Sequence, residues 1–120
     1  PENGISMSYK DRLDFLDMVQ KTILLRIFKD IKGNNRTYAD YYQQDVPVLF
    51  NSIEDDDNVE NIVYSTLEQL CFYGYITHEV IQKPGKSFYH RLTILQLKEL
   101  EVLYEGQVKS LGELKNHQTN

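Results

Sequence analysis

Cys71, His78 and His90 are side chains of this sequence that could bind a metal ion or act as a nucleophile or base. His78 and His90 fall in two predicted strands and could approach each other, but a zinc site needs at least three protein ligands. Cys71 stands between Leu70 and Phe72 on an apolar helical stripe, which indicates a buried structural thiol. The sequence contains no phosphate-cradling glycine loop and no nucleophile motif. We therefore expect no metal, no cofactor and no enzymatic activity.

A second set of side chains could contact nucleic acid, and it falls into two groups. The side chains that could hydrogen-bond the edges of bases are Asn61, Tyr64 and Ser65. Those that could contact phosphates or enter the minor groove are Lys83, Lys86 and Arg91. Lys32 and Arg36 would join the second group if the fold brings them near. Lysines beside an exposed turn can also serve only to keep the chain soluble and to discourage strand pairing.

The charge of the chain is negative and unevenly spread. The net charge is −5; residues 51–75 hold six acids and no base, and residues 76–93 hold three bases and one acid. The acids just before and along the predicted third helix are Asp55, Asp56, Asp57, Glu60 and Glu68. They would repel the phosphates of a duplex. They could instead form a docking face for another protein, or a solvated helix start that is stabilised by the helix dipole.

The length and composition fit one soluble domain. The chain has 120 residues, 41% of them hydrophobic, and a single cysteine, so it can bury a core without disulfides. No apolar run approaches the ~20 residues that cross a membrane. We expect a leader at 1–8 that is disordered or foreign to the natural protein, one domain at 9–115 and a frayed tail at 116–120. We expect an intracellular protein, in the cytoplasm or nucleoid, or in the nucleus if the organism is eukaryotic.

The elements that must position these side chains begin with a long helix. An apolar stripe at three- and four-residue steps predicts a helix from Asp11 to Lys32, which Gly33 ends. The second helix of a helix-turn-helix has two candidates. Thr37–Gln44 has a capping box at its start, and Pro47–Ile53 has proline near its first turn. We favour Pro47–Ile53 because it leaves a short gap before the next helix.

A third helix and a β-hairpin follow. The helix is predicted from about Asp57 to Gly74. Its buried stripe is predicted to be Val59, Ile62, Val63, Thr66, Leu67, Leu70 and Cys71. The strands Ile76–Gln82 and Ser87–Thr93 are rich in β-branched and aromatic residues. The Pro-Gly pair between them suits a type II turn.

A final helix is predicted after Thr93, which has capping-box spacing to Gln96. Its apolar stripe approaches the seven-residue repeat of helices that pack side by side. We expect a homodimer held through this stripe, at Leu97, Leu100, Tyr104, Val108 and Leu111.

The segment Val63–Thr93 resembles the recognition helix and wing of winged-helix domains in PadR- and MarR-type regulators. The matching residues are Leu70-Cys71-Phe72-Tyr73-Gly74-Tyr75-Ile76 and Tyr89-His90-Arg91-Leu92-Thr93. The resemblance implies a mainly α fold with a small β-hairpin: a winged helix-turn-helix with a long N-terminal helix and a C-terminal dimerisation helix. Two departures are the missing glycine after Leu-Thr and the acidic third helix, which in DNA-reading members usually offers basic or uncharged side chains.

The resemblance implies the winged-helix DNA-binding module of a dimeric transcription regulator. The wing would lie on phosphates of double-stranded DNA and the third helix toward the bases. The alternative is an acidic winged-helix domain for protein interaction or dimerisation, cut from a larger replication, silencing or chromatin protein. DNA binding would depend on Lys83 and Lys86, whereas protein docking would depend on the acidic face of the third helix.

Overall fold

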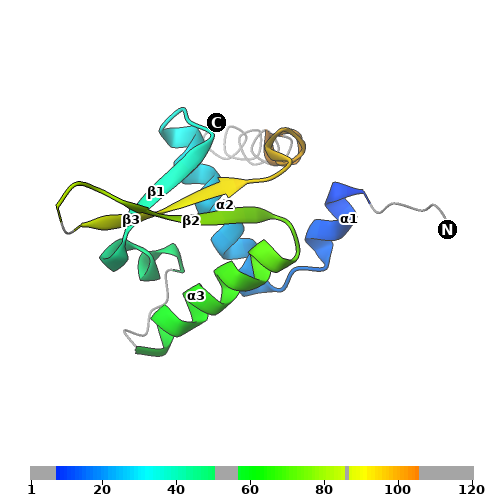
Figure 1. Cartoon of the computed structure of the whole chain (residues 1–120). Coiled ribbons are helices and arrows are strands. Elements are labelled where there is room, and N and C mark those ends of the chain that lie inside the picture. Colours follow the sequence, from blue (N-terminus) through cyan, green and yellow to red (C-terminus); the bar gives the residue numbers. More distant parts are fainter. Residues whose placement is uncertain (1–7, 51–56, 86, 106–120) are drawn as a thin grey trace, which may run out of the picture. The chain divides into compact units, whose positions relative to one another are not determined.

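Helices and a three-stranded antiparallel sheet form this protein in the computed structural model, which describes residues 8–50, 57–85 and 87–105 (Figure 1). The chain divides into two compact units. The larger unit is Leu16–Leu95 and contains the sheet, and the smaller joins Pro1–Phe15 to Gln96–Asn120. The predicted combination of helices with antiparallel strands is therefore confirmed, and the sheet has one strand more than predicted. The winged helix-turn-helix topology stays a prediction.

The predicted single helix from Asp11 to Lys32 is wrong, because the chain leaves the helical conformation at Asp17. Helix α1 covers Tyr9–Asp14, and helix α2 covers Met18–Gly33. The backbone of Asp17 is extended, and its side chain accepts a hydrogen bond from the Gln20 N–H at 2.8 Å. The Gln20 side chain accepts from the Asp17 N–H at 3.0 Å, which completes a capping box. Asp17 therefore starts a new helix.

The apolar stripe of α2 is buried, as predicted. Its buried residues are Gln20, Ile23, Leu24, Ile27, Phe28 and Ile31. Helix α3, Asp57–Phe72, confirms the predicted third helix and contacts α2. Gln20, the polar member of the α2 stripe, donates a hydrogen bond to the side-chain oxygen of Gln69 in α3 at 2.9 Å. This bond satisfies a buried amide and joins the two helices.

Helix α3 buries most of its predicted stripe. The buried residues are Val63, Thr66, Leu67 and Leu70. Ile62 was predicted to be buried, but it is 41% exposed. It lies about 100° round the helix from Val63, at the edge of the buried side. The helix also contacts β2 and the turn η2, so its buried side faces both the sheet and the connection from β1.

The segment Thr37–Gln44, one candidate for the second helix, forms a strand. Strand β1, Tyr38–Tyr42, pairs along its whole length with β3. Ala39 and Tyr41 are buried, whereas the residues that alternate with them are more exposed. Tyrosine fits a half-buried strand well. Strand pairing and burial therefore outweigh the capping box at the start of the segment.

The predicted helix Pro47–Ile53 is also wrong in its described part. Two short 3-10 turns, η1 at Gln43–Asp45 and η2 at Pro47–Leu49, occupy this region. Phe50 has an extended backbone, with φ −115° and ψ 102°, so η2 ends after a single turn. Pro47 lies at the start of this turn, where its missing N–H costs nothing. Residues 51–53 lie outside the described residues.

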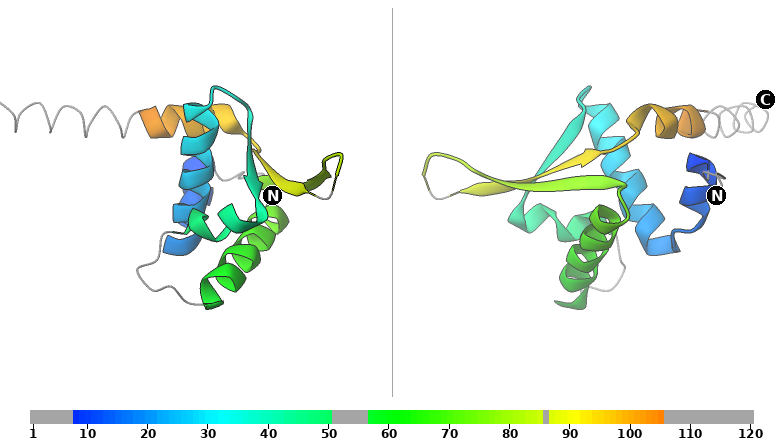
Figure 2. Two further views of the ribbon diagram at one scale, coloured as in Figure 1. Left: turned by 90° about the vertical axis from the view of Figure 1, so that its left-hand side faces the viewer. Right: turned by 45° about the vertical axis from the view of Figure 1, so that its right-hand side comes forward.

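The β-hairpin after α3 agrees with the sequence prediction. Strand β2 is Ile76–Gln82, as predicted, and β3 is Phe88–Ile94, one residue later than predicted. Gly74 ends α3 with φ 82°, and Gly85 takes φ 102° in the turn; both conformations favour glycine. The hairpin extends past the helices of the larger unit (Figure 2).

The sheet has the order β1-β3-β2, and its two faces differ. Helix α2 contacts β1 and β3, and α3 contacts β2. The side chains on the covered face include Ala39, Tyr41, Ile76, His78, His90, Leu92 and Ile94. The opposite face, here called the outer face, carries Tyr38, Asp40, Tyr42, Thr77, Glu79, Ile81, Tyr89, Arg91 and Thr93.

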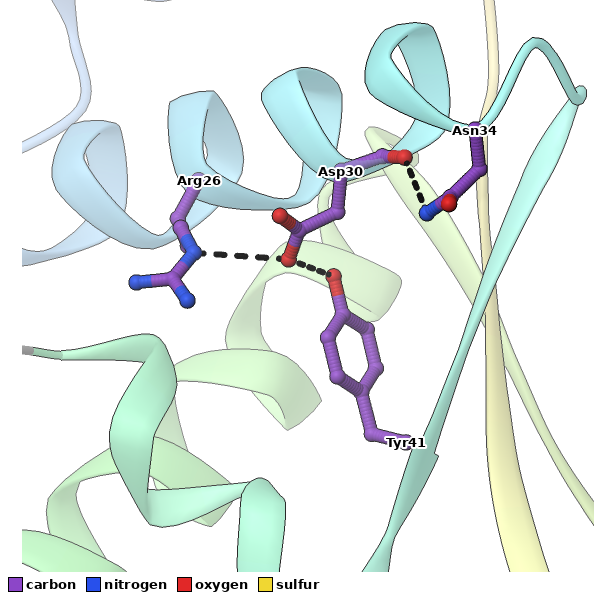
Figure 3. A network of polar contacts seen from close by, with 4 residues as sticks. All are labelled: Arg26, Asp30, Asn34 and Tyr41. Carbon is purple, nitrogen blue, oxygen red and sulfur yellow. Dashed lines mark hydrogen bonds and ion pairs between the residues drawn. The ribbon is translucent and has the colours of Figure 1, made fainter.

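A polar network fastens β1 to α2 (Figure 3). The Tyr41 hydroxyl donates a hydrogen bond to Oδ2 of Asp30 at 2.7 Å. Arg26, one turn earlier in α2, donates to the same oxygen at 3.3 Å. The side-chain amide of Asn34 donates to the Asp30 carbonyl at 2.9 Å. Burial, and then the bond to Asp30, raise the pKa of Tyr41 far above its ordinary value.

The smaller unit contains α1 and a helical segment at 97–105. Ser8 caps α1 by accepting a hydrogen bond from the Asp11 N–H at 3.2 Å. Arg12 of α1 donates to the side-chain oxygen of Gln96 at 2.8 Å. This bond joins the two terminal segments.

The predicted helix cap at Thr93 is wrong. Thr93 lies within β3, paired with Tyr38 on one side and Thr77 on the other. These two neighbours keep the chain extended through Ile94. Gln96 then takes φ 58°, and the helical residues begin at 97.

Candidate nucleic-acid interface

The outward side of α3 carries uncharged hydrogen-bonding side chains. Asn61 and Ser65, here called the α3 ridge, are exposed and lie one turn apart on the same side of the helix. Tyr64, the third predicted base contact, is half-buried, and its hydroxyl lies 3.4 Å from Nε2 of His90. Burial, and then Glu60, raise the pKa of the Tyr64 phenol. The structure therefore exposes two of the three predicted base contacts.

Helix α3 contains no lysine or arginine. Glu60 and Glu68 are exposed, and Glu68 lies on the same side as the α3 ridge because it follows Ser65 by three residues. Asp55 and Asp56 lie outside the described residues, as does the side chain of Asp57. A polyanion at this helix would therefore gain no attraction from its side chains.

The basic side chains of the hairpin have different surroundings. Lys83 is exposed at the end of β2 and donates a hydrogen bond to the Tyr42 hydroxyl at 3.0 Å. This bond raises the pKa of Lys83, so its ammonium stays charged at neutral pH. Lys86 lies outside the described residues.

Arg91 is fixed on the outer face of the sheet. Its guanidinium donates to both carboxylate oxygens of Asp40, at 2.9 and 3.1 Å. This pairing raises the pKa of Arg91 above its ordinary value. Its neighbour His90 points to the covered face and toward α3. Arg91 and the α3 ridge are therefore separated by the sheet, and the six predicted contacts do not form one surface.

His78 and His90 approach each other, as predicted. Nε2 of His78 lies 2.8 Å from Nδ1 of His90, and Nε2 of His90 lies 2.8 Å from Oε1 of Gln43. Because Oε1 of Gln43 only accepts, we assign the proton of His90 to Nε2, and Nδ1 accepts from His78. Burial lowers the pKa of both histidines, and proximity to His90 lowers that of His78 further. The neutral pair joins β2, β3 and η1.

Within 8–50, 57–85 and 87–105, no group of three or more His, Cys, Asp or Glu side chains could hold a metal ion. Cys71 is half-buried rather than buried. Burial, and then Glu68, raise the pKa of its thiol, which disfavours the nucleophilic thiolate. In the same part of the chain, no helix has both the length and the apolar character that a membrane span requires.

The predicted dimerisation stripe is only partly described. Leu97 and Tyr104 are half-buried, and Leu100 is buried. Val108 and Leu111 lie outside the described residues. The homodimer stays a prediction, and Leu100 offers little apolar surface to a partner.

A comparison of this chain with known proteins finds no match. The chain matches no protein-family model, no curated protein and no solved structure. The resemblance to winged-helix regulators therefore depends on the residues of α3 and of the hairpin.

Sequence reasoning missed two exposed features. Phe72 is 86% exposed and Tyr73 is 54% exposed, at the end of α3. Phe72 follows Asn61 by eleven residues, about three helical turns, so the spacing already placed it on the side of the α3 ridge. The outer face of the sheet was missed because β1 was not predicted. The signal there was the alternation that places Tyr38 and Tyr42 on one side of a strand.

Proposed function

We propose that this chain is a winged-helix domain that binds double-stranded DNA. The α3 ridge would meet base edges in the major groove, and Lys83 of the hairpin would meet the phosphate backbone. The observation that carries the proposal is the exposed pair Asn61 and Ser65, one turn apart on a helix that leads directly into a projecting hairpin. Asparagine recognises adenine through two hydrogen bonds, and serine can bond several bases.

The charge of the domain limits how tightly it holds DNA. Among the described residues of the hairpin, Lys83 is the base available for phosphates, because Arg91 is paired with Asp40; the sequence offers Lys86 as a second base. Two phosphate contacts per chain correspond to a slope of about −2 for the logarithm of the binding constant against the logarithm of salt concentration. Most of the discrimination among DNA sequences would then come from the α3 ridge.

The test is fluorescence anisotropy of a labelled duplex pool at several salt concentrations, followed by selection of a preferred sequence. Lys83→Gln should weaken binding to all duplexes and lower the salt slope by about 1. Asn61→Ala with Ser65→Ala should reduce the preference among sequences with little change in slope. Lys29→Gln removes an equal charge from an exposed position on α2 and is the matched control. An absence of duplex binding at about 100 μM protein and low salt would refute the proposal.

The second candidate function is docking of a protein at the C-terminal half of α3. A shallow hollow of about 330 Å³ is lined by Ser65, Glu68, Gln69, Phe72 and Tyr73. Exposed aromatic residues are typical anchors of protein interfaces. Because the helix is acidic and lacks a base, the partner segment that fits is basic with one apolar anchor.

A crosslinking experiment separates this candidate from DNA binding. Phe72→Ser and Glu68→Lys should both abolish capture of a basic partner and leave duplex binding intact or strengthened, since Glu68→Lys removes a repelling charge. Asn61→Ala should have the opposite pattern. Loss of duplex binding on Phe72→Ser, with the fold intact by circular dichroism, would count against a separate protein site.

A further inference from the structure

The outer face of the sheet carries a row of alternating cations and tyrosine rings. Arg36 lies 5.5 Å from the ring centre of Tyr38, and Arg91, on the neighbouring strand β3, lies 4.1 Å from the same ring. Lys83 lies 5.1 Å from the ring centre of Tyr89. These distances are within the range of cation–π attraction.

Two cations of this row lack a carboxylate partner among the described residues. Arg91 is neutralised by Asp40, but neither Arg36 nor Lys83 forms an ion pair with a described residue. Among the described residues, Lys83 is held by the Tyr42 hydroxyl and by ring contacts, and Asp40 attracts it without forming an ion pair; its side chain is exposed. Arg36, Lys83 and Arg91 outnumber the two acids of the outer face, Asp40 and Glu79, by one charge, on a chain whose net charge is −5. This local excess of positive charge attracts an anion.

Arg36, Lys83 and Tyr89 of this row also line a shallow hollow. Its volume is about 250 Å³, and its walls are Arg36, Asp40, Tyr41, Tyr42, Lys83 and Tyr89. Arg36 lies near Tyr38 at the start of β1 and Lys83 bonds Tyr42 at its end, and the Cα atoms of these two tyrosines are about 13 Å apart along the strand. That separation suits a short anionic polymer better than a single phosphate.

We propose that the outer face of the sheet binds single-stranded nucleic acid, with phosphates at Arg36 and Lys83 and a base against Tyr42. The aromatic residues decide between polyanions, because every base has a face that stacks on a tyrosine ring, whereas an acidic peptide has none. Tyr42 is 42% exposed, and its ring meets that of Tyr89 edge-on at 6.4 Å, which leaves part of the Tyr42 ring accessible. The Lys83 ammonium lies 5.3 Å from the ring centre of Tyr42, so on binding it would leave this ring for a phosphate and the base would take its place.

This site is separate from the one proposed for duplex DNA. The α3 ridge belongs to a helix that contacts the covered face, and the residues of the new site lie on the outer face. Lys83 is common to both, so tests of the new site use Arg36 and Tyr42. A negative result for the single-stranded site then does not decide whether the α3 ridge binds duplex DNA, and a negative result for duplex DNA does not decide the single-stranded site.

The experiment is fluorescence anisotropy of a labelled 15-nucleotide oligothymidine with the full chain at low salt. Tyr42→Leu should weaken binding by about 5- to 150-fold, the effect of losing one stacked base. Tyr42→Phe keeps the ring and should restore binding. Arg36→Gln should weaken binding and make it less sensitive to salt, whereas Lys29→Gln, the matched charge control, should change it by less than about twofold. Asn61→Ala with Ser65→Ala should leave it unchanged.

Three results would overturn the proposal. One is no binding of the oligonucleotide at about 100 μM protein. Another is equal weakening by Tyr42→Leu and Tyr42→Phe, since the ring would then have no part. The third is equal affinity for an oligoglutamate of the same length, which would indicate a general polyanion or acidic-peptide site. Circular dichroism of each variant verifies that the fold is kept.

Discussion

Nε2 of His78 lies 2.8 Å from Nδ1 of His90, across the paired strands β2 and β3. The contact requires one protonated and one unprotonated nitrogen, so it is lost when both histidines are charged. His90 is 5% exposed, and its surroundings include Gln43 of η1 and Tyr64 of α3. Protonation of both rings would place two N–H groups against each other.

The first prediction concerns stability and pH. Burial lowers the folded-state pKa of both histidines below their unfolded value of about 6.5. The unfolded chain then binds more protons than the folded chain at the same pH. The free energy of unfolding therefore has its largest contribution from these histidines above about pH 6.5, and this contribution falls as pH decreases through and below that value. Urea unfolding at intervals between pH 7.5 and 5 measures this decrease. His78→Gln with His90→Gln should flatten it, and an unchanged decrease in that variant would assign it to other groups.

The second prediction concerns the bond between Tyr41 and Asp30. Tyr41→Phe removes the hydroxyl that donates to the Asp30 carboxylate. The bond from Arg26 to that carboxylate remains. The free energy of unfolding should fall by about 1.5–3 kcal/mol, the value of a hydrogen bond to a charged group. Tyr42→Phe removes a hydroxyl from the exposed face and should have a much smaller effect. Equal effects in urea unfolding of the two variants would contradict the importance of the network.

The third prediction concerns the end of α3. Gly74 has φ 82°, a conformation that costs a residue with a Cβ roughly 1–2 kcal/mol. Gly74→Ala should therefore lower the free energy of unfolding by about that amount. A Cβ added at Gly33, at the end of α2, would meet no atom within 4 Å. Gly33→Ala should be neutral or stabilising by up to about 1 kcal/mol, which makes it the matched control. Thermal or urea unfolding of both variants measures the difference.

The fourth prediction concerns the oligomeric state. If the final helix dimerises, sedimentation equilibrium should give a mass of two chains at tens of micromolar protein. Leu97→Glu places a charge on the predicted stripe and should shift the equilibrium to the monomer. Leu100→Ala should instead lower stability by about 2–5 kcal/mol, because this side chain is buried in the single chain. A monomeric mass for the unmodified chain would contradict the predicted dimer.

Helix α3 and the hairpin were predictable because their local signals agree with their tertiary surroundings. Gly74 provides the stop that the backbone needs, and Gly85 provides the positive φ of the turn. The apolar stripe of α3 has the helical period, and β2 has the residues that strands favour. No competing signal interrupts either element.

Strand β1 and the break before α2 were not predictable in this way. Thr37 offered a helix cap, but β1 gains its hydrogen bonds from β3, about fifty residues later in the chain. A pattern read within a short window cannot weigh such a distant partner. The break at Asp17 has a capping signal, which a continuous apolar stripe concealed.

The sequence by itself determined which residues alternate along β2 and β3 and which residues share a side of α3. It thus separated Arg91 from His90 and grouped Asn61 with Ser65, because these periods are properties of the backbone. Only the tertiary structure decided that α2 and α3 contact the side of the sheet that carries His90. That contact buries the histidine pair and leaves Arg91, Tyr42 and Lys83 on the outer face. The reason is that helices bury their apolar stripes against the sheet face with the larger apolar area. All three strands contribute to that area, including β1 through Ala39 and Tyr41.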